Sequence, residues 1–122
     1  MEGNPLSKVF IPQVPRFRNP DSTEHEFIPK LDLSPAKNYG ELVECVSSAA
    51  SPHDTDEVIE VLNEVLYNYS DDDYLLCVGS PIIIGWATAI AASYNEGKLN
   101  MLVWDKFRGG YKVVKAHLWS NE

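Results

Sequence analysis

The run of residues 74–95 places the strongest constraint on how this 122-residue chain can fold. Residues 74–78, YLLCV, are continuously apolar, which is typical of a short strand buried on both faces of a parallel sheet. A Gly-Ser-Pro turn follows, with Ser80 at the N-cap and Pro81 at the first position of a helix. Residues 82–95 predict a helix that is apolar nearly all round and therefore buried. This succession indicates an α/β fold.

The predicted helix is rich in small residues, which would let it approach a sheet closely. They are Gly85, Ala87, Ala89, Ala91 and Ala92. The apolar segment of residues 81–94 is shorter than the roughly 18–20 residues that a membrane span requires, so a core helix explains it better.

Other segments extend the α/β pattern toward the N-terminus. Residues 34–40 predict a one-turn helix with Ser34 as its N-cap, and residues 41–47 favour a strand. Residues 54–69 predict an amphipathic helix that begins at Asp54, because apolar residues recur there at helical spacing.

The C-terminal part alternates like two strands, over residues 98–105 and 111–119, and KFRGG between them suits a hairpin turn. The predicted fold is therefore a small, mainly parallel sheet with two crossover helices and a C-terminal β-hairpin. The two helices could flank the sheet or share one face.

Prolines crowd the start of the chain and predict an extended N-terminal arm over residues 1–33, followed by a single domain over residues 34–122. Six of the eight prolines are Pro5, Pro12, Pro15, Pro20, Pro29 and Pro35. The arm also carries apolar side chains that a solvated linker would not need, so we expect it to pack on its own body or on a neighbour. Phe10 and Phe17 are its candidate partner contacts, and exchange of the arm would create a homo-oligomer.

Charge is distributed unevenly along this chain of net charge −8. Residues 41–73 contain no lysine or arginine, and their acidic residues are Glu41, Glu44, Asp54, Asp56, Glu57, Glu60, Glu64, Asp71, Asp72 and Asp73. The predicted helix 54–69 would expose Asp56, Glu57, Glu60 and Glu64, which form either a solvated face or a docking face for a basic partner. An acidic chain is a poor general binder of phosphate backbones, so nucleic acid is not the expected partner.

The predicted hairpin turn carries the opposite charge. Lys106, Phe107, Arg108, Tyr111 and Lys112 mix positive charge with aromatic rings, a combination that suits packing against an acidic protein surface or stacking on a base. A plain solvated hairpin is the alternative. Trp104 and Trp119 are expected to anchor the strands.

Catalytic and metal-binding motifs are not found in the sequence. VGSPI lacks the second glycine of a nucleophile elbow, the Gly-Ser-Pro turn lacks a phosphate-binding motif, and His25, His53 and His117 have no metal-ligand spacing. Cys45 and Cys77 are expected to be free thiols. We therefore expect that the protein binds no cofactor and is not an enzyme. A small-molecule or nucleotide site would have to lie in the loops SSAASPHD and GSP, at the carboxyl ends of the strands.

Two stretches, LDLSPAKNYGELVECV and DDDYLLCVGSPIIIGWATAIAASYNEGKLNMLVWDKFRGGYKVVKAHL, resemble small uncharacterised proteins of tailed bacteriophages. In those proteins the turn is Gly-Asp-Pro where this chain has Gly79, Ser80 and Pro81, and a Trp-Asp dipeptide similarly ends the strand at Trp104 and Asp105. The resemblance covers residues 31–118 and implies a phage accessory protein in the host cytoplasm or in the particle. It carries no catalytic residues.

The expected function is that of a non-enzymatic interaction protein that binds a host protein or machine. The acidic helix, the arm and the hairpin are its expected contact surfaces. A structural or decoration component of the virion is the alternative, and a small-molecule binder is the second alternative.

Overall fold

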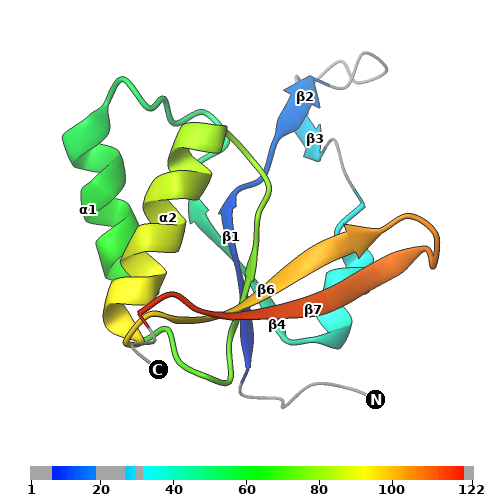
Figure 1. Ribbon diagram of the computed structural model, residues 1–122. Helices are drawn as coiled ribbons and strands as arrows, with labels where there is room; N and C mark the ends of the chain where they lie inside the picture. The colour runs from blue at the N-terminus through cyan, green and yellow to red at the C-terminus, as the bar shows by residue number, and fades with distance from the viewer. Residues whose placement is uncertain (1–6, 19–26, 30–31, 120–122) are drawn as a thin grey trace.

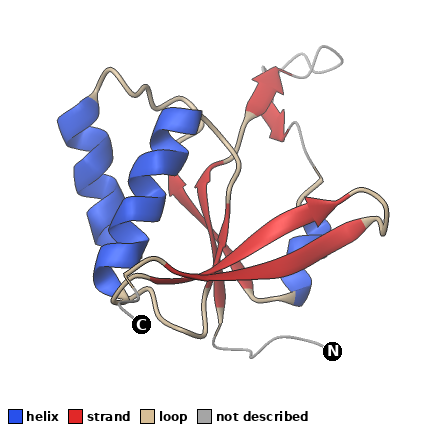
Figure 2. Ribbon diagram, in the orientation of Figure 1, coloured by secondary structure: helices blue, strands red, loops and turns tan. Residues whose placement is uncertain are grey.

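A computed structural model describes residues 7–18, 27–29 and 32–119 of the chain. These residues form a five-stranded sheet, a separate two-stranded ribbon and two α-helices (Figures 1 and 2). In chain order the elements are β1 (Lys8–Gln13), β2 (Arg16–Arg18), β3 (Phe27–Pro29), the 3₁₀ helix η1 (Ser34–Asn38), β4 (Glu41–Val46), α1 (Thr55–Leu66), β5 (Tyr74–Leu76), α2 (Pro81–Tyr94), β6 (Lys98–Asp105) and β7 (Gly110–His117). The predicted α/β class, with a mainly parallel sheet and a C-terminal hairpin, is confirmed.

The strand order of the large sheet is β4-β1-β5-β6-β7. The strand β1 pairs in parallel with β4 and β5, β5 pairs in parallel with β6, and β7 is antiparallel to β6. Both α-helices lie on one face of this sheet (Figure 2). The chain steps across the sheet in the same direction from β4 to β5 and from β5 to β6, so two right-handed crossovers place both helices on the same side.

The strand β1 corrects the predicted N-terminal arm. Residues 8–13 form an internal strand of the sheet, so this segment belongs to the domain that was expected to begin at residue 34. Pro12 is tolerated because β1 pairs with β5 only through Val9 and Phe10, and the missing amide of Pro12 lies beyond that pairing. The expected packing of the arm on its own body is confirmed for β1, whereas exchange between subunits stays a prediction.

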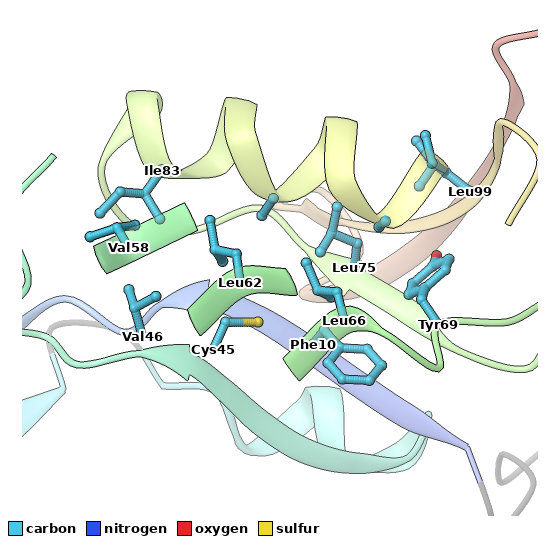
Figure 3. Close-up of a cluster of buried hydrophobic side chains, with 13 residues drawn as sticks. Phe10, Cys45, Val46, Val58, Leu62, Leu66, Tyr69, Leu75, Ile83 and Leu99 are labelled. Carbon is cyan, nitrogen blue, oxygen red and sulfur yellow. The ribbon is translucent and has the colours of Figure 1, made fainter. Parts of the chain in front are cut away.

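Two hydrophobic clusters hold the sheet from either side. Beneath the helices, Phe10 packs with Leu62, Leu75 and other buried side chains (Figure 3). On the opposite face, Val9 and Ile11 lie in a second cluster that η1 covers through Ala36. Burying one side chain of this size contributes about 1.5–3 kcal/mol. Phe10 is therefore a core residue, which corrects its expected role as a partner contact.

The helix α1 has the predicted amphipathic pattern, with Val58, Leu62 and Leu66 buried against the sheet. Asp54 occupies the N-cap position as predicted, although its side chain makes no capping hydrogen bond. The helix ends at Leu66 rather than at residue 69, and Tyr69 turns into the core instead. Its hydroxyl accepts a hydrogen bond from the amide of Asn100 at 3.1 Å.

The helix α2 begins at Pro81 with Ser80 at the N-cap, as predicted. Its buried residues are Ile83, Ala87, Ala91 and Ala92. The expected core helix buries only one of its faces, because Ile82 is 53% exposed and Gly85 and Ala89 also face solvent. A Cβ added at Gly85 would meet nothing within 4 Å, so this glycine does not serve close packing against the sheet.

The predicted short helix is the 3₁₀ helix η1, but Ser34 is its first residue rather than its N-cap. The amide of Ser34 donates to the carboxylate of Asp32 at 3.0 Å. At the other end of the domain, Trp119 packs over Gly97, where any side chain would clash with its indole ring. Trp119 thus anchors the base of the β6–β7 hairpin, as expected.

Candidate interaction surfaces

The exposed face of α1 gathers the predicted acidic residues. Asp56, Glu57, Glu60 and Glu64 are all exposed, and the buried face of the helix lies on the sheet. Within the described part of the chain, these four carboxylates take part in no salt bridge. The face is consequently a row of uncompensated negative charge.

The turn between β6 and β7 is tightly hydrogen bonded. The carboxylate of Asp105 accepts the amides of Phe107 at 3.0 Å and Arg108 at 3.3 Å, and its carbonyl accepts the amide of Gly109 at 2.9 Å. Gly109 has φ +69°, a left-handed conformation that suits glycine. The turn therefore holds its exposed side chains on a defined backbone.

The hairpin turn presents Phe107 almost completely to solvent, at 92% relative exposure. The ammonium group of Lys106 lies 5.9 Å from the centre of the Phe107 ring, and Arg108 is exposed beside them. We call Lys106, Phe107 and Arg108 the hairpin tip. In Figure 1 the tip and α1 lie at opposite ends of the domain.

Tyr111, the fourth hairpin residue expected to contact a partner, is half-buried. Its backbone carbonyl accepts the hydroxyl of Tyr39 at 2.9 Å, and its ring packs edge-on against Trp104 with the ring centres 5.1 Å apart. Burial, together with the nearby Asp32, raises the pKa of the Tyr111 hydroxyl. Trp104, expected to anchor a strand, is instead half-exposed and adds apolar surface next to the tip.

The two loops at the carboxyl edge of the sheet converge on Gln13. The amide nitrogen of its side chain donates to the carbonyls of Ser47 at 3.1 Å and Ala50 at 3.0 Å, and its side-chain oxygen accepts the amide of Ser80 at 3.2 Å. Gly79 has φ +115°, and a Cβ there would lie 2.6 Å from the carbonyl oxygen of Gln13. The two loops are therefore tied together by the protein itself.

These hydrogen bonds already use groups that a nucleotide site at these loops would need. The amide of Ser80 is one that an anion would use at the start of α2, and Gln13 already occupies it. The hydroxyl oxygens of Ser47 and Ser51 accept the amides of Ala49 and His53, each at 3.1 Å, so they stabilise local turns.

A hollow of about 410 Å³ opens on the face of the sheet opposite α1 and α2. It lies at the carboxyl ends of β5 and β6, and its lining is mainly apolar, with Leu76, Leu102 and Trp104 among the lining residues. Asp32 adds a carboxylate at the rim. A volume of this size falls within the range of small-molecule sites. Sequence reasoning missed it, because its walls come from segments far apart in the chain.

The aspartates 71–73 divide between the surface and the core. Asp73 is buried, and its carboxylate accepts the amides of Lys8 and Ser70, each at 3.0 Å. Asp71 receives hydrogen bonds from Asn95 and Lys98, which lower the pKa of its carboxyl group. Across the described ranges, no group of three or more His, Cys, Asp or Glu residues could hold a metal ion.

The cysteines are both free, and both lie beneath the helices. Burial raises the pKa of the Cys45 thiol to about 12 and also raises the pKa of Cys77. Phe17, the remaining arm candidate, belongs to β2, and its side chain lies outside the described part of the structure. None of the helices in the described ranges is both long and apolar enough to cross a membrane.

Comparison with known proteins identifies a matching family. A family model described as Phage Pam3 gp32-like protein matches residues 7–118, which include every strand and helix of the described domain. No curated protein and no solved structure matches the chain. The resemblance to bacteriophage proteins is confirmed and extends to β1.

Proposed function

We propose that this chain, which belongs to the Phage Pam3 gp32-like family, is a non-enzymatic phage accessory protein that binds a protein partner through its hairpin tip. The observation that carries the proposal is the exposure of Phe107 on a hydrogen-bonded turn between two cations. A large apolar side chain fixed in this position loses little conformational freedom when it enters a partner's pocket. The surrounding charge favours a pocket with an acidic rim.

The acidic face of α1 supplies a second contact surface at the other end of the domain. Its carboxylates would dock on a basic partner or keep the tip's partner in one orientation by repulsion. A host protein or machine in the host cytoplasm is the proposed target. A neighbouring protein of the virion is the alternative, in which case the chain is a decoration component.

The test is affinity capture of the tagged chain from infected cells, with mass spectrometry of what is retained. We expect a stoichiometric partner with the natural chain and its loss with Phe107→Ala. The matched control is Tyr67→Ala, which removes another exposed ring from the end of α1. If Phe107→Ala retains the partner as well as the control does, the hairpin tip is not the contact surface. Charge reversal at Glu57, Glu60 and Glu64 tests the acidic face in the same assay.

The hollow near Trp104 favours a second candidate function, the binding of a small, mainly apolar molecule with a donor group for Asp32. A library of such molecules should raise the melting temperature of the natural chain, and Leu102→Trp, which fills the hollow, should abolish the rise. A set of compounds that shifts both proteins equally would place binding elsewhere.

A further inference from the structure

Among the residues that the structure describes, none covers the outer face of α2. Ile82 is 53% exposed and Gly85 and Ala89 are exposed, whereas Trp86 and Ile90 beside them are partly buried against the core. The helix sequence PIIIGWATAIAASY contains no charged residue. A helix that is apolar all round is normally buried all round, so its exposed face is out of keeping with the rest of this charged surface.

The apolar surface extends onto the sheet next to α2. Met101 and Ala116 pack into the helix-side cluster, and the register of β6 and β7 places Val103 and Val114 on the same side of the sheet. Val103 is 44% exposed and Val114 is 41% exposed. The helix and the helix-side face of the hairpin thus both expose apolar side chains, and Lys112 lies beside Val103 on that face.

The distribution of charge favours a second copy of this chain as the partner that binds the outer face of α2. A chain of net charge −8 repels its own copies wherever its acidic surfaces meet, but the α2 face is neutral. Its two flanks carry opposite charge, because α1 lies on one side with exposed carboxylates and β7 lies on the other with the exposed Lys112 (Figure 1). Two copies related by an axis parallel to α2 would set each acidic flank against the basic flank of the other copy.

The geometry also suits close packing between helices. Gly85 and Ala89 are four residues apart on the exposed face, and nothing lies within 4 Å of a Cβ added at Gly85. Small residues at a crossing point allow a short distance between the helix axes. A specific interface buries roughly 800 Å² per partner, about a tenth of the surface of a small protein. The accessible surface of this chain is 7894 Å², so the interface need bury only about a tenth of it on each copy.

We propose that the chain forms a two-fold symmetric homodimer in which the outer faces of α2 pack against each other in parallel, with Val103 and Val114 at the margin. The dimer would present two hairpin tips. This inference does not depend on what the tips bind.

Sedimentation equilibrium over a range of protein concentrations tests the proposal. We expect the natural chain to associate reversibly into dimers. The variant Ala89→Glu places two carboxylates opposite each other and should raise the dissociation constant by a factor of about 100 or more. The matched control Asn68→Glu adds the same charge at an exposed position beyond α1 and should leave the dissociation constant within about threefold of the natural value. Circular dichroism should show both variants folded, because neither position is buried.

Oxidative cross-linking tests the orientation. In a parallel arrangement Ser93→Cys lies opposite its own copy and should form a disulfide-linked dimer, as should Ala89→Cys. The native thiols are buried or half-buried and should not compete. A monomer at every concentration, or a dimer that Ala89→Glu leaves intact, would overturn the proposal. Cross-linking at residue 89 without cross-linking at residue 93 would overturn the parallel arrangement.

Discussion

The helices α1 and α2 lie side by side on the same face of the sheet, yet they meet solvent in opposite ways. The outer face of α1 is a row of carboxylates, whereas the outer face of α2 is uncharged and partly apolar. Both bury one stripe of side chains in the same cluster. The difference shows that a shared core does not dictate what a helix exposes, and that the exposed faces carry separate information about partners.

The largest effect should come from the shared core. Leu62→Ala, in the buried stripe of α1, should lower the free energy of unfolding by about 2–5 kcal/mol, because the lost methyl groups leave a cavity. Ile82→Ala, on the exposed face of α2, should lower it by less than about 1 kcal/mol when measured at low protein concentration. Urea denaturation followed by circular dichroism measures both. Equal losses would mean that the outer face of α2 is already packed in the monomer.

The next effect should come from Gln13, which ties the loop before α1 to the turn before α2. Replacing it with Leu leaves partly buried backbone groups without partners and should lower the free energy of unfolding by about 1 kcal/mol. Hydrogen exchange of the Ser80 amide is expected to accelerate more than that of amides in β6. If only one of the two helix starts loosens, Gln13 does not couple them.

The free energy of unfolding, measured as a function of pH, should distinguish the contributions of two buried groups under the helices. Burial raises the pKa of Cys45 from 9.0 to about 12 and that of Tyr69 from 10.0 to about 12. The folded state holds these protons more tightly than the unfolded state, so stability is intact below pH 9 and falls as pH rises toward 12. Each group can contribute a slope of up to about 1.4 kcal/mol per pH unit. Cys45→Ala should reduce the fall in unfolding free energy that begins near pH 9. An unchanged curve would argue against burial of the Cys45 thiol.

The smallest effect should come from Gly85. In Gly85→Ala the new methyl group meets nothing within 4 Å, and the unfolded chain loses freedom, so stability should rise by about 0.5–1 kcal/mol. Thermal melting at low protein concentration measures this change. A loss of stability would show that the outer face of α2 has less room than its backbone suggests.

The same two helices explain what could be predicted from the sequence. Charged residues mark the outer face of α1, so its burial pattern was predicted correctly. No charge marks a face on α2, so nothing distinguished Gly85 and Ala89, which are exposed, from Ala87 and Ala91, which are buried. The parallel order and the hairpin followed from local apolar runs and turn residues. Those patterns predict structure correctly because they depend on residues that are close together in the chain.

The features that were missed depend on distant neighbours. The strand β1 was not predicted, because its proline argued against a central strand and its pairing partners are far away in sequence. The burial of Phe10 and the partial burial of Tyr111 follow from those pairings and from Tyr39, and no local pattern reports them. The hollow near Trp104 is assembled from four segments and could not be predicted for the same reason.

The place of β1 in the sheet has a consequence for how the chain is made. Strand β1 is synthesised before its neighbours in the sheet and must wait for them, since the hydrogen bond between Lys8 and Asp73 spans 65 residues. At a synthesis rate of about 5–20 residues per second, β1 would stay unpaired on the β5 side for several seconds. During that interval its apolar side chains are available to chaperones. Folding of this domain is therefore largely deferred until most of the chain has emerged.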